Sequence, residues 1–399
     1  MTGAQLPAVQ RLQFFLSESR WDPDRVNERR LELLLKDPAT APHEAGVLVI
    51  DDSGDRKDGA RTAHVGRQYL GRYGKTGNGV VTVTTLRADE RVYYPVHAVP
   101  YTPAKYFAKG KNDPAFRTKL AIGAGLAVQA REAGFAFRAV VADSAYGGQD
   151  GFRGELAEAG LPFVMALRPR RGIWARAADA HTPVDAARAL AWGGPEDPGD
   201  WHPVVRTFRD GHAETWQAAE ATLGGWGPDG VRRLVIATAD PAILPDKATW
   251  YLVTSLPRPG GPHEADSPHP AASLAEVVRI YGLRNWVEQS YKQVKDELGW
   301  AGFQVRSGCR DPPAPGAGPL RVQLLLGRLV RRSPAAARQR GTAAAAWPRR
   351  EGGRTPPSRG RRPGRGRCAR CAPGFPRGPC CSAGGPHGQR RPRRRNCKP

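Results

Sequence analysis

The chain has 399 residues, enough for two domains, and its 40% hydrophobic content is compatible with a sizeable buried core. It contains no run of 18 apolar residues, and residues 1–20 lack a signal-like apolar segment, so we expect a cytoplasmic protein without membrane spans. The formal net charge of +23 suggests a polyanionic partner such as nucleic acid.

Most of that charge lies in residues 308–399, which hold 22 Arg, one Lys and two acidic residues, a formal charge of +21. Residues 1–307 are therefore nearly neutral, at +2. The abrupt change to Arg, Pro, Gly and Ala favours out-of-frame translation of a GC-rich gene, and a genuine basic tail that binds nucleic acid is the alternative. Cys368 and Cys371 have zinc-like spacing, but no hydrophobic periodicity around them supports a zinc site.

The first predicted elements are helices and strands. Residues 8–36 predict one or two short helices, with Asp22 or Asp24 as the cap. The run "GVLVIDDSGD" is continuously apolar and ends in polar turn residues, which is typical of a buried strand. The runs "GVVTVTTLRA" and "RVYYPVHAV" are rich in β-branched and aromatic residues and predict two more strands.

A helix and a fourth strand follow. The stretch "DPAFRTKLAIGAGLAVQAREAG" predicts a helix that Asp113 and Pro114 open and Gly134 closes. The run "FRAVVADSAYGG" predicts a buried strand that ends on Asp143. Three strands, one helix and one strand, with an acid on the first strand and another after the fourth, is the order of the ribonuclease-H-like fold.

The second half predicts a helix at residues 149–160, then strands in "FVMALR", "RRLVIATAD" and "TWYLVTSLP". About 145 residues separate Asp143 from Glu288, more than one connection needs, so a β-rich insertion is expected there. The predicted α/β organisation has five segments: a remnant helical region at 1–46, the first part of a ribonuclease-H-like core at 47–168, the β-rich insertion at 169–265, the C-terminal helices of the core at 266–307, and a disordered, low-complexity basic tail at 308–399.

The stretch "YGLRNWVEQSYKQVKDELGW" at residues 281–300 predicts a helix with a charged face. Steps of three, four, four and three place five residues on that face: Tyr281, Arg284, Glu288, Lys292 and Lys295. A plain surface helix explains the pattern if Glu288 and Lys292 form an i,i+4 pair, worth a few tenths of a kcal/mol.

Three acids separated in sequence suggest a metal site instead. Two metal ions about 3.5–4 Å apart activate a water or a 3′-hydroxyl during phosphodiester cleavage, and Mg²⁺ prefers carboxylate ligands. The candidate ligands are Asp51 or Asp52, Asp143 and Glu288. Neighbouring strand residues face opposite ways, so only one of Asp51 and Asp52 can point into such a site. Each acid taken alone is equally consistent with a turn or a strand end.

The motifs "VLVIDDSGDRKDG", "VVADSAYGG" and "YGLRNWVEQSYKQVKDELG" resemble the three acidic motifs of bacterial insertion-sequence DDE transposases, including the signature Y-x2-R-x3-E-x6-K. The resemblance implies that Asp51, Asp143 and Glu288 hold divalent metal, as two Mg²⁺ or Mn²⁺ ions, and that the enzyme cuts transposon ends and joins them to target DNA. It further implies that four residues contact DNA phosphates: Tyr281, Arg284, Lys292 and Lys295. It leaves open whether the protein forms a homodimer in the DNA complex.

The chain also departs from that family. Only about 46 residues precede the first predicted strand, where relatives carry a longer helical region that binds transposon ends. After "GFQVRS" the sequence becomes rich in Arg, Pro and Gly where relatives continue with a helical segment. We therefore expect a copy truncated at its N-terminus and frameshifted at its C-terminus. The alternatives to an active transposase are a catalytically incompetent, inhibitory DNA-binding remnant and a stand-alone ribonuclease-H-like nuclease.

Overall fold

The computed structural model describes residues 22–60, 62–172, 180–208, 210–227, 230 and 232–297, together with the backbone of residues 331–332. All of them belong to one compact unit within residues 1–344. The helix expected before residue 22 and nearly all of the tail at 308–399 lie outside the described residues. In the described part of the chain, no helix is long and apolar enough to cross a membrane.

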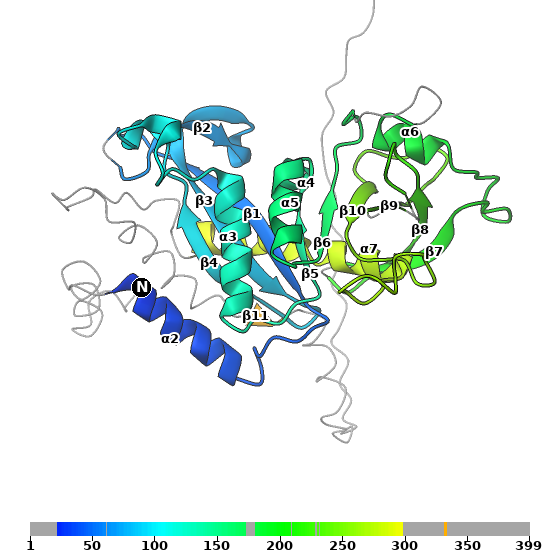
Figure 1. Cartoon of the computed structure of the whole chain (residues 1–399), viewed down its shortest axis with the longest axis horizontal. Helices are drawn as coiled ribbons and strands as arrows, with labels where there is room; N and C mark the ends of the chain where they lie inside the picture. The colour runs from blue at the N-terminus through cyan, green and yellow to red at the C-terminus, as the bar shows by residue number, and fades with distance from the viewer. Residues whose placement is uncertain are drawn as a thin grey trace, which may run out of the picture. The chain divides into compact units, whose positions relative to one another are not determined.

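One mixed sheet of eleven strands organises this unit (Figure 1), with the order β11-β4-β3-β1-β5-β6-β10-β9-β8-β7 and with β2 paired to β3. β1 is parallel to β5 and β5 to β6, whereas the other pairs are antiparallel. The strands are β1 Val47–Arg56, β2 Gly66–Leu70, β3 Lys75–Ala88, β4 Val92–Pro100, β5 Ala139–Ala142, β6 Phe163–Ala166, β7 His202–Thr207, β8 Ala213–Ala221, β9 Arg233–Thr238, β10 Thr249–Thr254 and β11 Arg331–Arg332.

Helices cover both faces of the sheet. α3 and α5 lie on one face, and α7 and α8 lie on the other (Figure 1). The helices are α2 Pro23–Lys36, α3 Lys119–Glu132, α4 Ser144–Gly147, α5 Asp150–Glu158, α6 Pro183–Arg188, α7 Leu274–Gly282 and α8 Asn285–Lys292, with a π turn, η5, at Gln293–Glu297. Short 3₁₀ turns are η2 Gly71–Tyr73, η3 Ala104–Tyr106 and η4 Gly110–Asn112.

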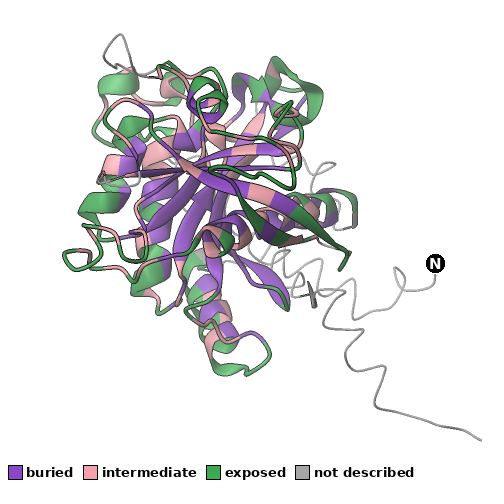
Figure 2. Cartoon of the chain, turned by 90° about the vertical axis from the view of Figure 1, so that its right-hand side faces the viewer, coloured by how far each residue is buried: buried purple, intermediate pink, exposed green. Residues whose placement is uncertain are grey.

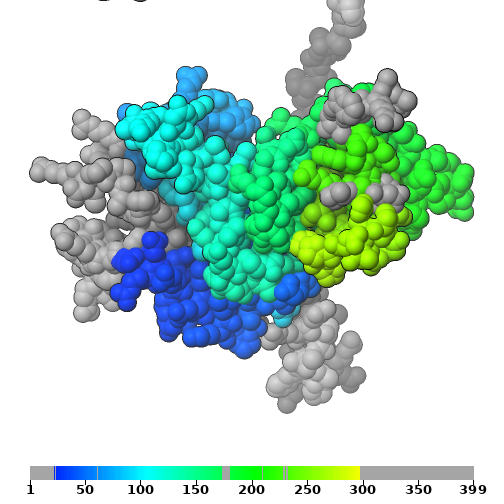
Figure 3. All heavy atoms as spheres, in the orientation of Figure 1, coloured from blue at the N-terminus to red at the C-terminus, as the bar shows by residue number. Residues whose placement is uncertain are grey.

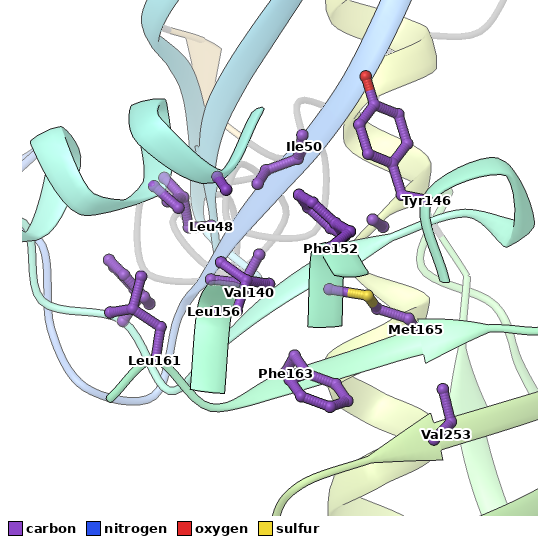
Figure 4. Packing of buried hydrophobic residues seen from close by; sticks show 14 of the residues in the cluster. Leu48, Ile50, Val140, Tyr146, Phe152, Leu156, Leu161, Phe163, Met165 and Val253 are labelled. Atoms are coloured by element: carbon purple, nitrogen blue, oxygen red, sulfur yellow. The ribbon is translucent and has the colours of Figure 1, made fainter. Parts of the chain in front are cut away.

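The side chains of β1 divide between two hydrophobic clusters. Leu48 and Ile50 pack with residues of α3 and α5, including Phe152 (Figure 4). Val47 and Val49 pack on the opposite face against α7 and α8. Successive strand residues point to opposite faces, so a strand covered on both sides needs a continuous apolar run, as "VLVI" provides. Figure 2 shows the resulting band of buried strands through the middle of the unit.

Two predicted boundaries were wrong. The helix expected from Asp113 begins at Lys119, capped by Thr118. Asp113 instead accepts hydrogen bonds from the amides of Lys109 and Ala115 and so closes a turn. The polar residues after Ile50, which were expected to form a turn, instead continue β1, since the strand pairs with β3 as far as Arg56.

The stretch between Asp143 and Glu288 contributes strands β6 to β10. β10 pairs with β6, so β7 to β10 extend the central sheet rather than forming a separate one. β7 and β8 lie in a stretch whose weak periodicity predicted no strands. The largely exposed β7 is at the edge of the sheet, where one partner strand and little burial leave only a faint apolar pattern.

Candidate active site

β1 sends its two central acids to opposite faces of the sheet. Asp51 follows Val47 and Val49 toward the helices α7 and α8, and its Oδ2 lies 3.3 Å from Nη2 of Arg284. Asp52 faces the other way, and its Oδ2 accepts a hydrogen bond of 3.1 Å from Lys119 Nζ at the start of α3. The alternation of a β-strand thus separates two adjacent carboxylates into different surroundings.

Asp143 lies beside Asp51 because their strands are parallel neighbours. Ile50 is opposite Ala142 in the register, and each acid comes next in its chain. Asp143 caps α4 by accepting a hydrogen bond of 2.9 Å from the amide of Ala145. Its other oxygen, Oδ2, lies 3.8 Å from Nη2 of Arg284.

Glu288 approaches the same guanidinium from α8. Its Oε1 lies 3.4 Å from Nη1 of Arg284, one helical turn earlier, and its side chain is 67% exposed. Among the described residues Glu288 forms no ion pair with Lys292, the partner expected of a plain surface helix. Arg284 is therefore within 4 Å of three carboxylates that arrive from β1, the end of β5 and α8.

The helix predicted at residues 281–300 is broken twice. α7 ends at Gly282 and α8 begins at Asn285, so Arg284 occupies the break between them. The π turn at Gln293–Glu297 then changes the rotation of the following side chains, because its hydrogen bonds span five residues rather than four. Lys295 is consequently buried instead of sharing an open face with Glu288.

The other predicted DNA contacts differ in their exposure. Lys295 donates a hydrogen bond of 3.1 Å to the carbonyl of Gly54, and its Nζ lies 3.3 Å from Oδ1 of Asp55. The ring of Tyr281 is packed edge-on against Trp250, with 4.9 Å between centroids, and the residue is 9% exposed. Lys292 is exposed.

Burial and charge oppose each other at Asp51. Its pKa is raised to about 7, mainly by burial and partly by the charge of Asp143, with Arg284 opposing the rise. Burial also lowers the pKa of the Arg284 guanidinium, but the surrounding acids raise it, and the net change is upward. Burial raises the pKa of Tyr281 to about 12, with Arg284 opposing. The site therefore favours a cation at its centre, and Arg284 supplies one.

The carboxylates match the chemistry of a hard divalent cation, but their present arrangement does not enclose one. No three Asp, Glu, His or Cys residues in the described ranges are grouped so as to hold a metal ion. Arg284 stands between the acids that would form such a group. Carboxylates donated by rigid strands suit Mg²⁺ or Mn²⁺, so the donor set fits if the guanidinium moves aside.

Sequence reasoning missed two neighbours of the acids. Lys119 neutralises Asp52, and no local pattern links residues 67 positions apart. Tyr146 is buried, its hydroxyl has no hydrogen-bond partner in the described part of the chain, and it lies near enough to feel the charges of Asp51, Asp52 and Asp143. The sequence feature that could have indicated this proximity is the position of Tyr146 three residues after Asp143.

Comparisons with known proteins show the family of the chain. Residues 6–222 match the family described as "DDE superfamily endonuclease". The chain is also 33% identical over 297 residues to a protein of Microchaete diplosiphon described as "Probable transposase for insertion sequence element IS701", which covers 74% of this chain and 68% of that protein. The chain belongs to the DDE superfamily of endonucleases, and within it to the transposases of insertion sequences, as the three acidic motifs predicted.

Proposed function

We propose that the protein cleaves DNA at the ends of an insertion sequence and transfers the cut strands to target DNA, using divalent metal held by Asp51, Asp143 and Glu288. The observation that carries the proposal is the convergence of these three carboxylates on one guanidinium. They come from elements far apart in sequence, so helical or strand periodicity alone does not bring them together.

The topology supports a ribonuclease-H-like core around this site. On one side of β1, β3 is antiparallel to β1 and β4 is antiparallel to β3, while β5 and β6 run parallel to β1 on its other side. In this proposal residues 47–168 and 266–307 form the core, and residues 169–265 form the β-rich insertion that extends its sheet.

The geometry supports Asp51 rather than Asp52 as the first ligand. Asp51 shares Arg284 with Asp143, whereas Asp52 is paired with Lys119 on the opposite face. When bound, two Mg²⁺ or Mn²⁺ ions would activate a water or a 3′-hydroxyl and stabilise the leaving oxygen. Asp51, Asp143 and Glu288 would hold them.

Arg284 has a second role in this proposal. Its guanidinium offers planar donors suited to a phosphate, and it stands at the position where the scissile DNA strand must meet the acids. We propose that it leaves the carboxylates when cations bind and then contacts the DNA backbone, together with Lys292. Tyr281 and Lys295 contact DNA only after giving up their present packing and ion pair.

Strand cleavage tests the proposal. The full chain is incubated with Mn²⁺ and a duplex that carries the ends of its own element and flanking DNA. We expect wild-type cleavage, and a fall of about a hundredfold or more in Asp51→Asn, Asp143→Asn and Glu288→Gln, because each loses charge that balances the metal. Asp52→Asn and the exposed helical variant Glu155→Gln are matched controls that retain cleavage.

Two outcomes count against this proposal. Retained cleavage in Glu288→Gln removes Glu288 from the site. Binding without cleavage by the wild-type chain favours the incompetent DNA-binding remnant. Because two transposon ends must be cut and joined, we further propose a homodimer in the DNA complex, which the molar mass of the complex tests.

A further inference from the structure

A second feature of the chain's surface lies next to the acids. It consists of the β2–β3 hairpin, residues 66–79, and the loop between β4 and α3, residues 101–119. These two segments hold eight Lys and Arg residues and one acid, a charge of +7. The rest of residues 1–307 then carries a net charge of −5, so the basic charge of the body is concentrated here.

Hydrogen bonds hold the loop against His64 and Val65, the two residues that directly precede the hairpin. The hydroxyl of Tyr106 donates a hydrogen bond of 2.9 Å to the carbonyl of Val65. Nδ1 of His64 lies 2.7 Å from Oγ1 of Thr102. Figure 3 shows the hairpin and the loop side by side at the top of the view, where they form one continuous surface.

The cations of this surface point to solvent. Arg67 alternates with buried Gln68 along β2, so the pleat of the strand directs it outward. Six exposed cations define what we call the basic-aromatic surface: Arg67, Arg72, Lys75, Lys105, Lys109 and Lys111. Among the described residues, five of the six form no ion pair with an acid: Arg67, Lys75, Lys105, Lys109 and Lys111. Arg72 has only a half-exposed pair with Asp296 at 3.8 Å.

Aromatic side chains lie among these cations. Tyr69 is 60% exposed, Tyr73 44% and Tyr106 39%, which makes them three of the six large exposed apolar side chains in the described residues. Nζ of Lys105 lies 4.9 Å from the ring centroid of Tyr106. Exposed tyrosines beside unpaired cations are typical of nucleic-acid surfaces, where the cations meet phosphates and the rings pack on sugars or bases.

The surface adjoins the carboxylates through the chain. The loop ends at Lys119, whose Nζ donates to Asp52, next to Asp51 in β1 but on the opposite face of the sheet. Arg72 reaches Asp296 in the π turn that follows Glu288. A DNA strand held at the acids would therefore continue across this surface.

We propose that the basic-aromatic surface binds the backbone of duplex DNA that flanks the cleavage position. This inference rests on the proposed function for its ligand, and charge complementarity with a polyanion supports it independently. The five cations without acidic partners supply the phosphate contacts, and the tyrosines shield those contacts from water.

Lysine labelling tests where the DNA lies. The full chain is treated with an amine-reactive reagent, with and without duplex DNA, in EDTA so that no cleavage occurs, and each lysine is followed by mass spectrometry. We expect DNA to slow the labelling of Lys75, Lys109 and Lys111 by about threefold or more, since ion-paired phosphates exclude the reagent. Lys36 on α2 and Lys247 in the β9–β10 turn are exposed controls.

Salt dependence provides a second measurement. In the double variant Lys109→Gln/Lys111→Gln, the slope of log Kobs against log salt should fall by roughly 2, because each lost phosphate contact removes about 0.9. Lys36→Gln/Lys247→Gln removes the same charge and should leave the slope unchanged. The inference would be overturned if the salt slope changed equally in the two double variants. It would also be overturned if DNA protected all five lysines equally, or if polyglutamate protected them as well as DNA does.

This outcome is separable from that of the proposed function. Protection at these lysines without metal-dependent cleavage would leave the surface assigned and remove the catalytic proposal. Cleavage that depends on Asp51, Asp143 and Glu288, but without protection of these lysines, would support the catalytic proposal and remove the assignment of the surface.

Discussion

Arg284 is the residue on which the described site depends. Its guanidinium contacts Asp51, Asp143 and Glu288, and its side chain is 15% exposed. Three acids gathered without a cation would repel one another, and burial already raises the pKa of Asp51 to about 7. Arg284 therefore compensates the acids while no metal is bound, and it competes with metal for the same charges.

This competition predicts the behaviour of Arg284→Ala. Without the guanidinium, the metal-free variant should be less stable than the wild type, because Asp51 and Asp143 lose their shared cation. A divalent cation should then bind about tenfold more tightly, equivalent to about 1.4 kcal/mol. Thermal unfolding above pH 7, with and without Mn²⁺, should show a larger rise in Tm for the variant.

Arg279→Ala is the matched control, since Arg279 forms an exposed ion pair with Glu90 away from the acids. Its Mn²⁺-dependent shift should equal that of the wild type. A shift in Arg284→Ala no larger than this would mean that the guanidinium and the metal do not compete.

At the scale of elements, helix breaks and strand faces decide which residues meet. The gap between α7 and α8 brings Arg284 to the acids, and the π turn buries Lys295 against Gly54 and Asp55. An ideal helix through residues 281–300 has neither feature. The predicted charged face was therefore partly wrong: Arg284 and Glu288 are neighbours, and Lys295 is not on an open face with them.

Helix α2 docks on β4 through polar contacts that include a buried histidine. Nδ2 of Asn27 lies 3.3 Å from Nδ1 of His97, and Arg30 donates to the carbonyls of Pro95 and Val96. Burial, and to a smaller extent the charge of Arg30, lower the pKa of His97 to about 4. His97 is therefore neutral in the folded protein at pH 7.

The docking of α2 should accordingly weaken in acid. The unfolded chain binds a proton at His97 near its ordinary pKa of 6.5, and the folded chain does so only near 4. The stability that neutral His97 preserves is fully present above pH 6.5 and is lost as the pH falls toward 4, by roughly 3 kcal/mol at 1.36 kcal/mol per unit.

Urea unfolding between pH 7 and pH 4 measures this effect. The difference in unfolding free energy between the wild type and His97→Gln should change by that amount over the range, in favour of the variant at low pH. His202→Gln, an exposed change on β7, is the control. A pH-independent difference between wild type and His97→Gln would contradict the assignment.

At the scale of the whole molecule, charge is divided between the chain's two regions. Residues 308–399 carry +21, whereas residues 1–307 carry +2, and the basic charge of the latter is concentrated on the basic-aromatic surface. Each phosphate that a protein neutralises releases counterions, so these two regions should contribute differently to DNA binding.

Removal of residues 308–399 should lower non-specific DNA affinity and reduce the salt slope of binding by roughly 5 or more, since many cations are lost together. Replacing the arginines of this segment by glutamine at constant length is the control for chain length and should give the same reduction. Fluorescence anisotropy with a duplex of unrelated sequence at several salt concentrations provides the slopes. An unchanged slope would place non-specific binding on the body alone.

The sequence by itself determined the family and the mixed α/β class. Continuous apolar runs predicted β1, β5 and β6, and the spacing of Tyr281, Arg284, Glu288 and Lys295, with two earlier acids, indicated a DDE transposase. These signals are local, because burial on both faces and motif spacing are written in neighbouring residues.

Only the tertiary structure decided which charges meet. It placed Asp51 and Asp52 on opposite faces, brought Asp143 beside Asp51 through parallel register, and set Arg284 among the three acids. It also revealed β2, a strand of only five residues, and β7, whose largely exposed residues leave a weak pattern. The physical reason is that contacts across 92 or 145 residues depend on strand register and helix packing, which no local periodicity records.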